Sequence, residues 1–289
     1  MLVHLIQAMR PKQWAKNVFL FAALVFDRKL TNLPAALITL AGFAVFCLLA
    51  SAIYLLNDLT DIEADRQHPT KRHRPIPSGR LPAPLAYAAA AVFLLAGLSA
   101  AFVLSRAFFV LCLIYLLSNL AYSHWLKHIP LLDVLLLAGF YVLRVGAGVA
   151  LIEVERFSPW LYVFTTFLAL FLGIGKRRAE LTRMADEAAS TRRALDGYTL
   201  PFLDQLLIIV SGMAIMTYSL YTFSAPNLPE NHAMMFTIPF VIYGMFRYLY
   251  IIQVEKRGEA PEDVLFSDRP LQIGLGLGGL AILAIFYIF

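Results

Sequence analysis

The chain has 289 residues, of which 60% are hydrophobic and only 15% are charged, and its formal net charge is +5. This composition excludes an ordinary soluble domain, which is about half apolar and about one quarter charged. The basic residues are spread over separate loops, which argues against a protein whose partner is a nucleic acid.

Apolar runs of about twenty residues recur along the chain, and each is long enough to cross a bilayer core of roughly 30 Å. We therefore predict an all-α, polytopic membrane bundle of about nine transmembrane helices that forms one integral-membrane domain over residues 1–289. The expected spans are 15–26, 33–56, 84–104, 107–123, 131–152, 159–174, 202–223, 233–254 and 271–289. The first span is the least typical, because it is short and begins close to Lys16 and Asn17.

Most of the 24 Lys and Arg residues lie in the amino-terminal segment and in every second loop. By the positive-inside rule, this side of the bundle faces the cytoplasm. We therefore predict a multi-pass protein of the plasma membrane, with its charged loops and its active site on the cytoplasmic side.

The stretch NDLTDIEADRQHPTKRHRPIPSG, residues 57–79, directly follows the second span. Asn57, Asp61 and Asp65 are spaced four residues apart, so a continuing helix would stack them on one face. Asp58 lies alongside them, and all four side chains offer the oxygen ligands that Mg²⁺ prefers when it also binds a substrate phosphate. We predict that Asn57, Asp58, Asp61 and Asp65 bind Mg²⁺, with Asn57, Asp58 and Asp61 as the catalytic residues.

A loop of mixed charge between two membrane helices is usually a solvated connection that sets topology. A solvated connection has no need of acids in register on one helix face, however, and this loop also places Lys71, Arg72 and Arg74 directly after them. An acidic cluster beside a cationic loop is typical of a diphosphate site. We therefore favour a binding site over a simple connection.

A second charged segment, GKRRAE at residues 175–180, follows the sixth span on the same side. A cation near the membrane end of a span binds phosphate in partly desolvated surroundings, as a fork for Arg177 or a point charge for Lys176. Tyr198, near the start of the next span, either closes this site or is an ordinary interfacial tyrosine. The expected topology anchors in this segment are Arg183, Arg192 and Arg193.

Two arginines fall within expected spans, where a charge is costly enough to indicate either function or a buried partner. Arg144 is expected to pair with Asp133 or to line a cavity. Arg247 lies near aromatic residues and is expected to snorkel toward the membrane surface.

Residues 57–79 resemble the first aspartate-rich motif of the UbiA superfamily of intramembrane prenyltransferases, including the trailing RPIPSG. The resemblance extends over the whole chain and implies a UbiA-like fold. Ordinary members carry a second aspartate-rich motif after the sixth span, which helps to bind the magnesium diphosphate of a prenyl donor. Here that place holds GKRRAEL, with Glu180 as its only acid. The segments GKRRAEL and RPKQWAKN (residues 10–17) together are similar to those of the UbiA branch whose members transfer phosphoribose to a polyprenyl phosphate.

That branch implies Mg²⁺ as cofactor, phosphoribosyl diphosphate (PRPP) as soluble donor, and a polyprenyl phosphate such as decaprenyl phosphate as lipid acceptor. It points to precursors of cell-wall arabinan. The substrates carry phosphates on C1 and C5 of the sugar and on the lipid, and these extra anions need cations more than carboxylates. The substrate-binding residues are then expected to be Lys16, Asn17, Asp65, Lys71, Arg72, Arg74, Arg144, Lys176, Arg177, Glu180 and Tyr198. We also expect that the bundle can form a homo-oligomer.

Two other functions remain open from the sequence. The first is an ordinary prenyltransferase that moves a prenyl group from its diphosphate to an aromatic acceptor. The second is an anion transporter, which the arginines within the spans would allow. A transporter needs polar residues on a path to both faces, and the short, nearly uncharged loops on the other side argue against it.

Overall fold

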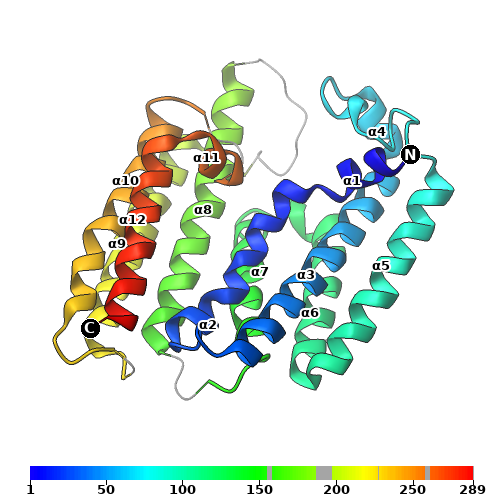
Figure 1. The fold of residues 1–289 in the computed structure, drawn as a ribbon. Helices are drawn as coiled ribbons and strands as arrows, with labels where there is room; N and C mark the ends of the chain where they lie inside the picture. Colours follow the sequence, from blue (N-terminus) through cyan, green and yellow to red (C-terminus); the bar gives the residue numbers. More distant parts are fainter. Residues whose placement is uncertain (155–157, 187–196, 227, 258–260, 289) are drawn as a thin grey trace. The chain divides into compact units, whose positions relative to one another are not determined.

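The computed structural model describes residues 1–154, 158–186, 197–226, 228–257 and 261–288, and all regular structure in these residues is helical. Among the described residues, eight helical segments are long and apolar enough to cross a membrane. They are α3 (Leu33–Thr60), α5 (Ala83–Leu104), α6 (Arg106–His124), α7 (Leu132–Val149), α8 (Pro159–Asp186), α9 (Leu200–Ser224), α10 (Ile238–Gln253) together with the preceding 3₁₀ turn, and α12 (Arg269–Tyr287). The shorter segments are α1 (Leu2–Met9), η1 (Pro11–Phe21), α2 (Ala22–Phe26), α4 (Ile62–Gln67), η2 (Lys71–His73), η3 (Leu126–His128), η5 (Ala233–Thr237) and α11 (Pro261–Ser267) (Figure 1).

These helices confirm an all-α membrane bundle, and the prediction of about nine spans is close to the eight observed. The difference lies at the expected first span, which consists of the 3₁₀ segment η1 followed by the short helix α2. Lys16 and Asn17 interrupt its apolar sequence, and a 3₁₀ helix has poorer hydrogen-bond geometry than an α-helix. The connection between the third and fourth expected spans is short, because only Ser105 separates α5 from α6.

The chain divides into two compact units, which are described separately. Unit 1 comprises Met1–Leu24, Lys29–His124 and Leu143–Glu153. Unit 2 comprises Val25–Arg28, Trp125–Val142 and Val154–Phe289.

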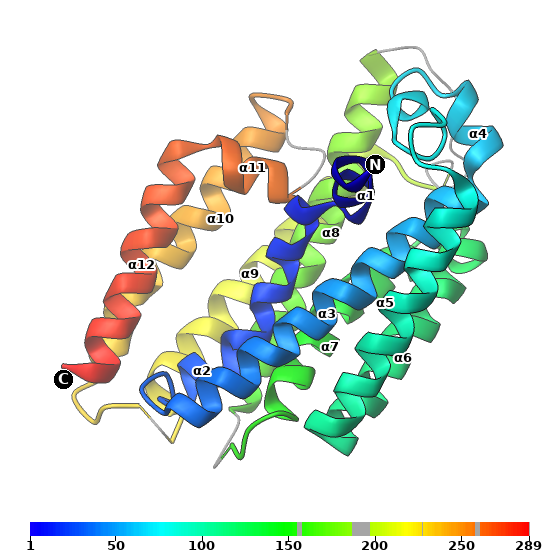
Figure 2. The same ribbon diagram turned by 45° about the vertical axis from the view of Figure 1, so that its right-hand side comes forward.

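Unit 1 is built around α3, which packs against α1, η1, α5 and α6 (Figures 1 and 2). Small residues allow the close contacts. A Cβ atom at Gly97 of α5 would lie 2.9 Å from the Leu49 side chain of α3, and one at Gly148 would collide with the carbonyl oxygen of Leu20. Small residues are typical of membrane-helix interfaces, where van der Waals packing must replace the hydrophobic effect. This packing holds in place the helix that carries the acidic motif at its end.

Unit 2 pairs α8 with α9 and α10 with α12. Here too, glycines lie under large side chains: a Cβ atom at Gly175 would be 2.7 Å from the Tyr248 ring, and one at Gly278 would be 2.9 Å from Phe240. Gly175 directly precedes the basic residues of α8, so its contact with Tyr248 fixes the position of that charged segment.

Arg247 lies near aromatic residues, as expected, with its guanidinium 5.2 Å from the centre of the Tyr250 ring, and the structure also gives it a carboxylate partner that was not predicted. Its Nε and Nη2 atoms donate to the two carboxylate oxygens of Asp268 at 3.1 and 2.7 Å. Asp268 also caps α12 by accepting from the Leu271 amide at 2.9 Å. The hydrogen bond from Arg247 holds the pKa of the Asp268 carboxyl below its ordinary value. The arginine therefore ties α10 to the start of α12.

Candidate active site

The acidic motif begins in the last turn of α3 and continues through α4. Hydrogen bonds from the Asp61 amide to the Asn57 carbonyl (3.0 Å) and from the Asp65 amide to the Asp61 carbonyl (2.8 Å) carry the helical spacing across the junction. Asp58 and Asp65 are both 2% exposed, whereas Asn57 and Asp61 are half-buried. Residues seven apart return to one helix face after two turns, so Asp58 and Asp65 form the buried pair of this motif.

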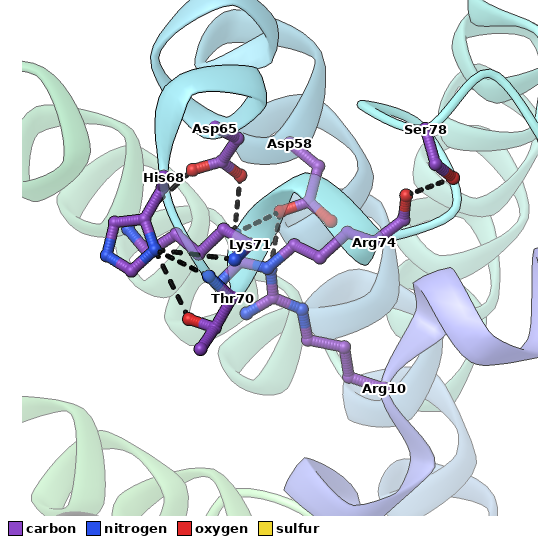
Figure 3. Close-up of polar contacts among 8 residues, drawn as sticks. All are labelled: Arg10, Asp58, Asp65, His68, Thr70, Lys71, Arg74 and Ser78. Atoms are coloured by element: carbon purple, nitrogen blue, oxygen red, sulfur yellow. Dashed lines mark hydrogen bonds and ion pairs between the residues drawn. The ribbon is translucent and has the colours of Figure 1, made fainter.

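One arginine joins the two buried carboxylates (Figure 3). Arg74 Nη1 lies 3.1 Å from Asp58 Oδ1 and 2.7 Å from Asp65 Oδ2. Lys71 Nζ lies 3.7 Å from Asp65 Oδ1. The structure thus brings together Asp58, Asp65, Lys71 and Arg74. Arg72, also an expected phosphate ligand, is exposed, and its Nε donates to His73 Nε2 at 3.2 Å.

Arg10 is a member of this cluster that the sequence interpretation missed. Its guanidinium forms an ion pair with Asp58 and lies 4.8 Å from the centre of the Tyr54 ring. The sequence did offer one signal for Arg10. It is the first residue of RPKQWAKN, it directly precedes Pro11, and it is a cation that follows an apolar segment. The partner itself could not be identified, because Arg10 and Asp58 are 48 residues apart.

The acidic motif provides a donor set that suits a hard cation. Among the described residues, no three or more His, Cys, Asp or Glu side chains lie close enough to hold a metal ion by themselves. The oxygens of Asp58 and Asp65 nevertheless converge on a single positively charged nitrogen. Mg²⁺ usually takes one or two carboxylates and completes its shell with water and substrate phosphates. The residues present therefore fit Mg²⁺ that is shared with a substrate.

Asn17 and Arg144 form a second polar group in unit 1. Arg144 Nε donates to Asn17 Oδ1 at 2.9 Å, and Arg144 Nη2 donates to the Tyr115 hydroxyl at 2.9 Å. Both residues are buried, and Asn17 also contacts Cys47 Sγ at 3.4 Å. Arg144 was expected to pair with Asp133 or to line a cavity; in unit 1 it bonds to Asn17 and Tyr115. In unit 2, Asp133 bonds to Arg177 and Tyr198. Lys16, next to Asn17 in η1, is half-buried.

The second charged segment forms a buried network in unit 2. Arg177 Nε donates to Asp133 Oδ2 and Arg177 Nη1 to Glu180 Oε2, both at 2.6 Å. The Tyr198 hydroxyl donates to Asp133 Oδ1 at 2.6 Å and accepts from the Leu131 amide at 2.6 Å. Burial and the hydrogen bond to Asp133 raise the pKa of Tyr198, so its hydroxyl stays protonated as a donor.

Lys176 lies at the edge of this network and is more accessible than its neighbour. Its side chain is 31% exposed, against 5% for Arg177, and its Nζ lies 4.0 Å from Glu180 Oε1. Arg178 does not join this network through its Nε atom, which lies 2.5 Å from Asp204 Oδ1. Lys176 is therefore the accessible cation of this group, while Arg177 is already bound to two carboxylates. Arg192 and Arg193 lie outside the described residues.

Comparison with known proteins agrees with the predicted resemblance. The sequence model of the UbiA prenyltransferase family matches residues 18–267. The chain is 34% identical over 279 residues to the decaprenyl-phosphate phosphoribosyltransferase of Corynebacterium glutamicum, covering 93% of this chain and 82% of that protein. It is 34% identical over 278 residues to the Mycobacterium tuberculosis protein of the same name, covering 93% and 89%.

The fold is similar to that of a UbiA homolog from Archaeoglobus fulgidus solved with GPP and Mg²⁺. The TM-score is 0.71 at 19% sequence identity, covering 98% of this chain and 99% of that one. A digeranylgeranylglyceryl phosphate synthase structure gives a TM-score of 0.65 at 17% identity, covering 100% of this chain and 99% of that one. At these identities the likeness shows the fold alone, whereas the family match and the relatives cover most of the sequence. The chain belongs to the UbiA prenyltransferase family.

Proposed function

We propose that this enzyme transfers a 5-phosphoribosyl group from PRPP to a polyprenyl phosphate, decaprenyl phosphate, and releases diphosphate. Support comes from the relatives that carry the name of this reaction and match 93% of the chain. The observation that carries the proposal is the character of α8 after Gly175. Within GKRRAE at residues 175–180, the acid Glu180 is bound to Arg177, and the side chain of Lys176 is more exposed than that of Arg177. This arrangement suits a phosphate better than a second magnesium diphosphate.

Unit 1 provides the residues for the donor diphosphate. Asn57, Asp58, Asp61 and Asp65 would hold Mg²⁺, which neutralises charge on the leaving diphosphate when it is bound. Arg74 and Lys71 already lie against these carboxylates, so they are placed to bind the outer oxygens of the same diphosphate. Arg72 is exposed and can reach the phosphate on C5. Binding and orientation are therefore the main work of this cluster.

The reaction needs no base from the protein. The lipid phosphate is ionised at neutral pH, and one of its oxygens attacks C1 of the ribose. The bond between C1 and the diphosphate oxygen breaks with both electrons leaving on the diphosphate, through a transition state with oxocarbenium character. Attack from the opposite face inverts C1. We propose that Lys176 binds one of the remaining phosphate groups, and that Arg177, Glu180 and Tyr198 keep α8 in position for it.

The proposal also covers the location of the active site and the use of the product. The distribution of Lys and Arg supports an active site on the cytoplasmic side of the plasma membrane, where a soluble donor is available. The product would then supply precursors of cell-wall arabinan. We propose that Asn17, Arg144 and Lys16 contribute to substrate binding in unit 1, and that the bundle can form a homo-oligomer.

The experiment that tests the function compares two donors. Purified enzyme in proteoliposomes receives decaprenyl phosphate with ribose-labelled PRPP, or an aromatic acid with a labelled prenyl diphosphate. We expect labelled lipid only from PRPP, its loss on addition of EDTA, and its recovery with excess Mg²⁺. Label transferred from the prenyl diphosphate to the aromatic acid, with none from PRPP, would show an ordinary prenyltransferase instead.

Replacing Lys176 with alanine is expected to weaken substrate binding and leave turnover nearly unchanged. A hydrogen bond to a charged group contributes roughly 1.5–3 kcal/mol, so KM should rise about 10- to 100-fold. The matched control is Arg183→Ala, which removes an exposed cation from the same helix. Steady-state kinetics with each substrate varied in turn would measure the effect. Equal kinetics for the two variants would mean that Lys176 only anchors the loop.

A further inference from the structure

The amino-terminal helix α1 is apolar on two sides. Its inner side packs Leu5 and Ala8 into a cluster with residues of α3, α5 and the loop after α4. Its outer side leaves Met1, Leu2, Val3 and Ile6 between 46% and 72% exposed. His4 and Gln7 bond to each other at 3.3 Å and form the polar part of the helix surface. A helix with this pattern is typical of one that lies in a membrane interface.

The depth of α1 along α3 indicates which partner covers the outer side. Ser51 Oγ donates to the Met9 carbonyl at 3.3 Å, and Trp14 Nε1 donates to the same Ser51 oxygen at 3.1 Å. Ser51 precedes the end of α3 at Thr60 by nine residues, which is roughly 13 Å along the helix axis. The carboxyl end of α1 therefore lies beside the apolar part of a membrane-spanning helix, and not beyond its end.

The neighbouring helix points to the same partner. Ala86 and Ala90 of α5 belong to the cluster that contains Ala8, and α5 exposes the large side chains of Tyr87, Val92 and Leu95. Lipid covers such a surface on a membrane span. The exposed apolar surface of α5 therefore lies beside α1, and we expect the same lipid environment at the outer side of α1.

The same helix also positions a residue of the candidate active site. Arg10 caps α1 in the left-handed conformation (φ 53°, ψ 64°), and its amide donates to the Gln7 carbonyl. This conformation is unfavourable for a residue with a side chain, so surrounding contacts must maintain it. From there the guanidinium reaches Asp58 (Figure 3). It also lies over the Tyr54 ring.

We propose that α1 is a lipid-docked helix: its outer apolar face inserts at the boundary between headgroups and acyl chains, and this contact holds Arg10 against Asp58. The occupant of the face is the bilayer of the membrane in which the protein resides. Arg10 is then a positioning residue for the acidic cluster, and its position depends on lipid contact. The inference does not require the proposed reaction to be correct.

A probe attached to α1 tests the lipid contact without any substrate. Full-length protein with Ile6→Cys or, as the matched control, Gln7→Cys is labelled with an environment-sensitive fluorophore and reconstituted. The native Cys47 and Cys112 are buried. Any fluorescence that comes from labelling these two cysteines is measured with the unsubstituted protein and subtracted. We expect blue-shifted emission at position 6 and at least twofold stronger quenching by doxyl-labelled lipids than at position 7. Equal quenching at both positions overturns the proposal, and so does blue-shifted emission that doxyl lipids do not quench, which would indicate a protein partner.

A second measurement tests the link to Arg10. In the variant with Leu2→Ser, Val3→Ser and Ile6→Ser, the inner contacts of Leu5 and Ala8 remain. We expect amide hydrogen exchange at residues 5–10 to accelerate at least tenfold in liposomes, with exchange in α3 unchanged as evidence of intact folding. Gln7→Ser serves as the control and should exchange like the unsubstituted protein. Unchanged exchange at Arg10 in the triple variant would show that lipid contact does not hold it.

Discussion

Replacing Asp58 with asparagine is expected to reduce kcat/KM by about 100- to 1,000-fold or more, because it removes a carboxylate from the centre of the charged cluster. The amide keeps the shape of the side chain and still accepts a hydrogen bond from Arg10 or Arg74. It no longer offers the charged oxygen on which both guanidinium groups converge. The loss should appear in steady-state transfer assays at saturating Mg²⁺.

The fold should survive this substitution. Arg10 and Arg74 are 28% and 30% exposed, so water can solvate them when the carboxylate is lost. The apparent melting temperature in detergent, and elution as a single species in size-exclusion chromatography, test whether the variant keeps the fold. The control is Glu63→Gln, which removes an 81% exposed carboxylate from the same motif and should retain full activity. Equal activity of the two variants would remove Asp58 from the active site.

Replacing Asp133 with asparagine is expected to lower the stability of unit 2 by about 3–5 kcal/mol. Asp133 is fully buried and accepts bonds from Arg177 and Tyr198, and the Arg177 side chain is only 5% exposed. Removing the charge leaves a buried guanidinium with Glu180 as its remaining described ion-pair partner. Thermal unfolding followed in detergent, at fixed lipid and protein concentration, measures the loss.

Two further variants show whether the loss of stability comes from burying an unpaired charge or from losing any carboxylate. Asp204→Asn removes a carboxylate that is 37% exposed and paired with Arg178, and it should cost much less. Asp133→Leu combined with Arg177→Met and Glu180→Gln removes all three charges of the buried network, and it should recover most of the stability that Asp133→Asn loses. If Asp133→Asn and Asp204→Asn are equally mild, the network does not stabilise unit 2.

Local features of the fold were predictable from the sequence. Hydropathy along α3, α5 and the later helices is a property of consecutive residues, so their positions followed directly. The acidic motif was equally local: helical spacing predicted Asn57, Asp61 and Asp65 on one face with Asp58 alongside. The structure buries Asp58 and Asp65 and leaves Asn57 and Asp61 half-buried. The segment at residues 15–26 was less regular than expected because its polar residues weaken the apolar pattern that the prediction uses.

The ion-pair partners could not be predicted in the same way. Arg177 and Asp133 are 44 residues apart, and Arg10 and Asp58 are 48 apart. Sequence identifies a costly charge within a span but not the carboxylate that compensates it, which depends on how the helices pack. The contacts of Arg144 with Asn17 and of Arg247 with Asp268 were accordingly not identified. The metal and phosphate roles of the acidic and basic residues remain predictions.

The most direct measurement of the central claim follows two labels of PRPP through one reaction. PRPP carries ³²P either in its 5-phosphate or in the β-phosphate of its diphosphate, and the reconstituted enzyme receives it with decaprenyl phosphate and Mg²⁺. We predict that the 5-phosphate label appears in the lipid extract and that the β-phosphate label appears only as free diphosphate. Absence of the 5-phosphate label from the lipid, or transfer of the β-phosphate label to it, would contradict phosphoribosyl transfer.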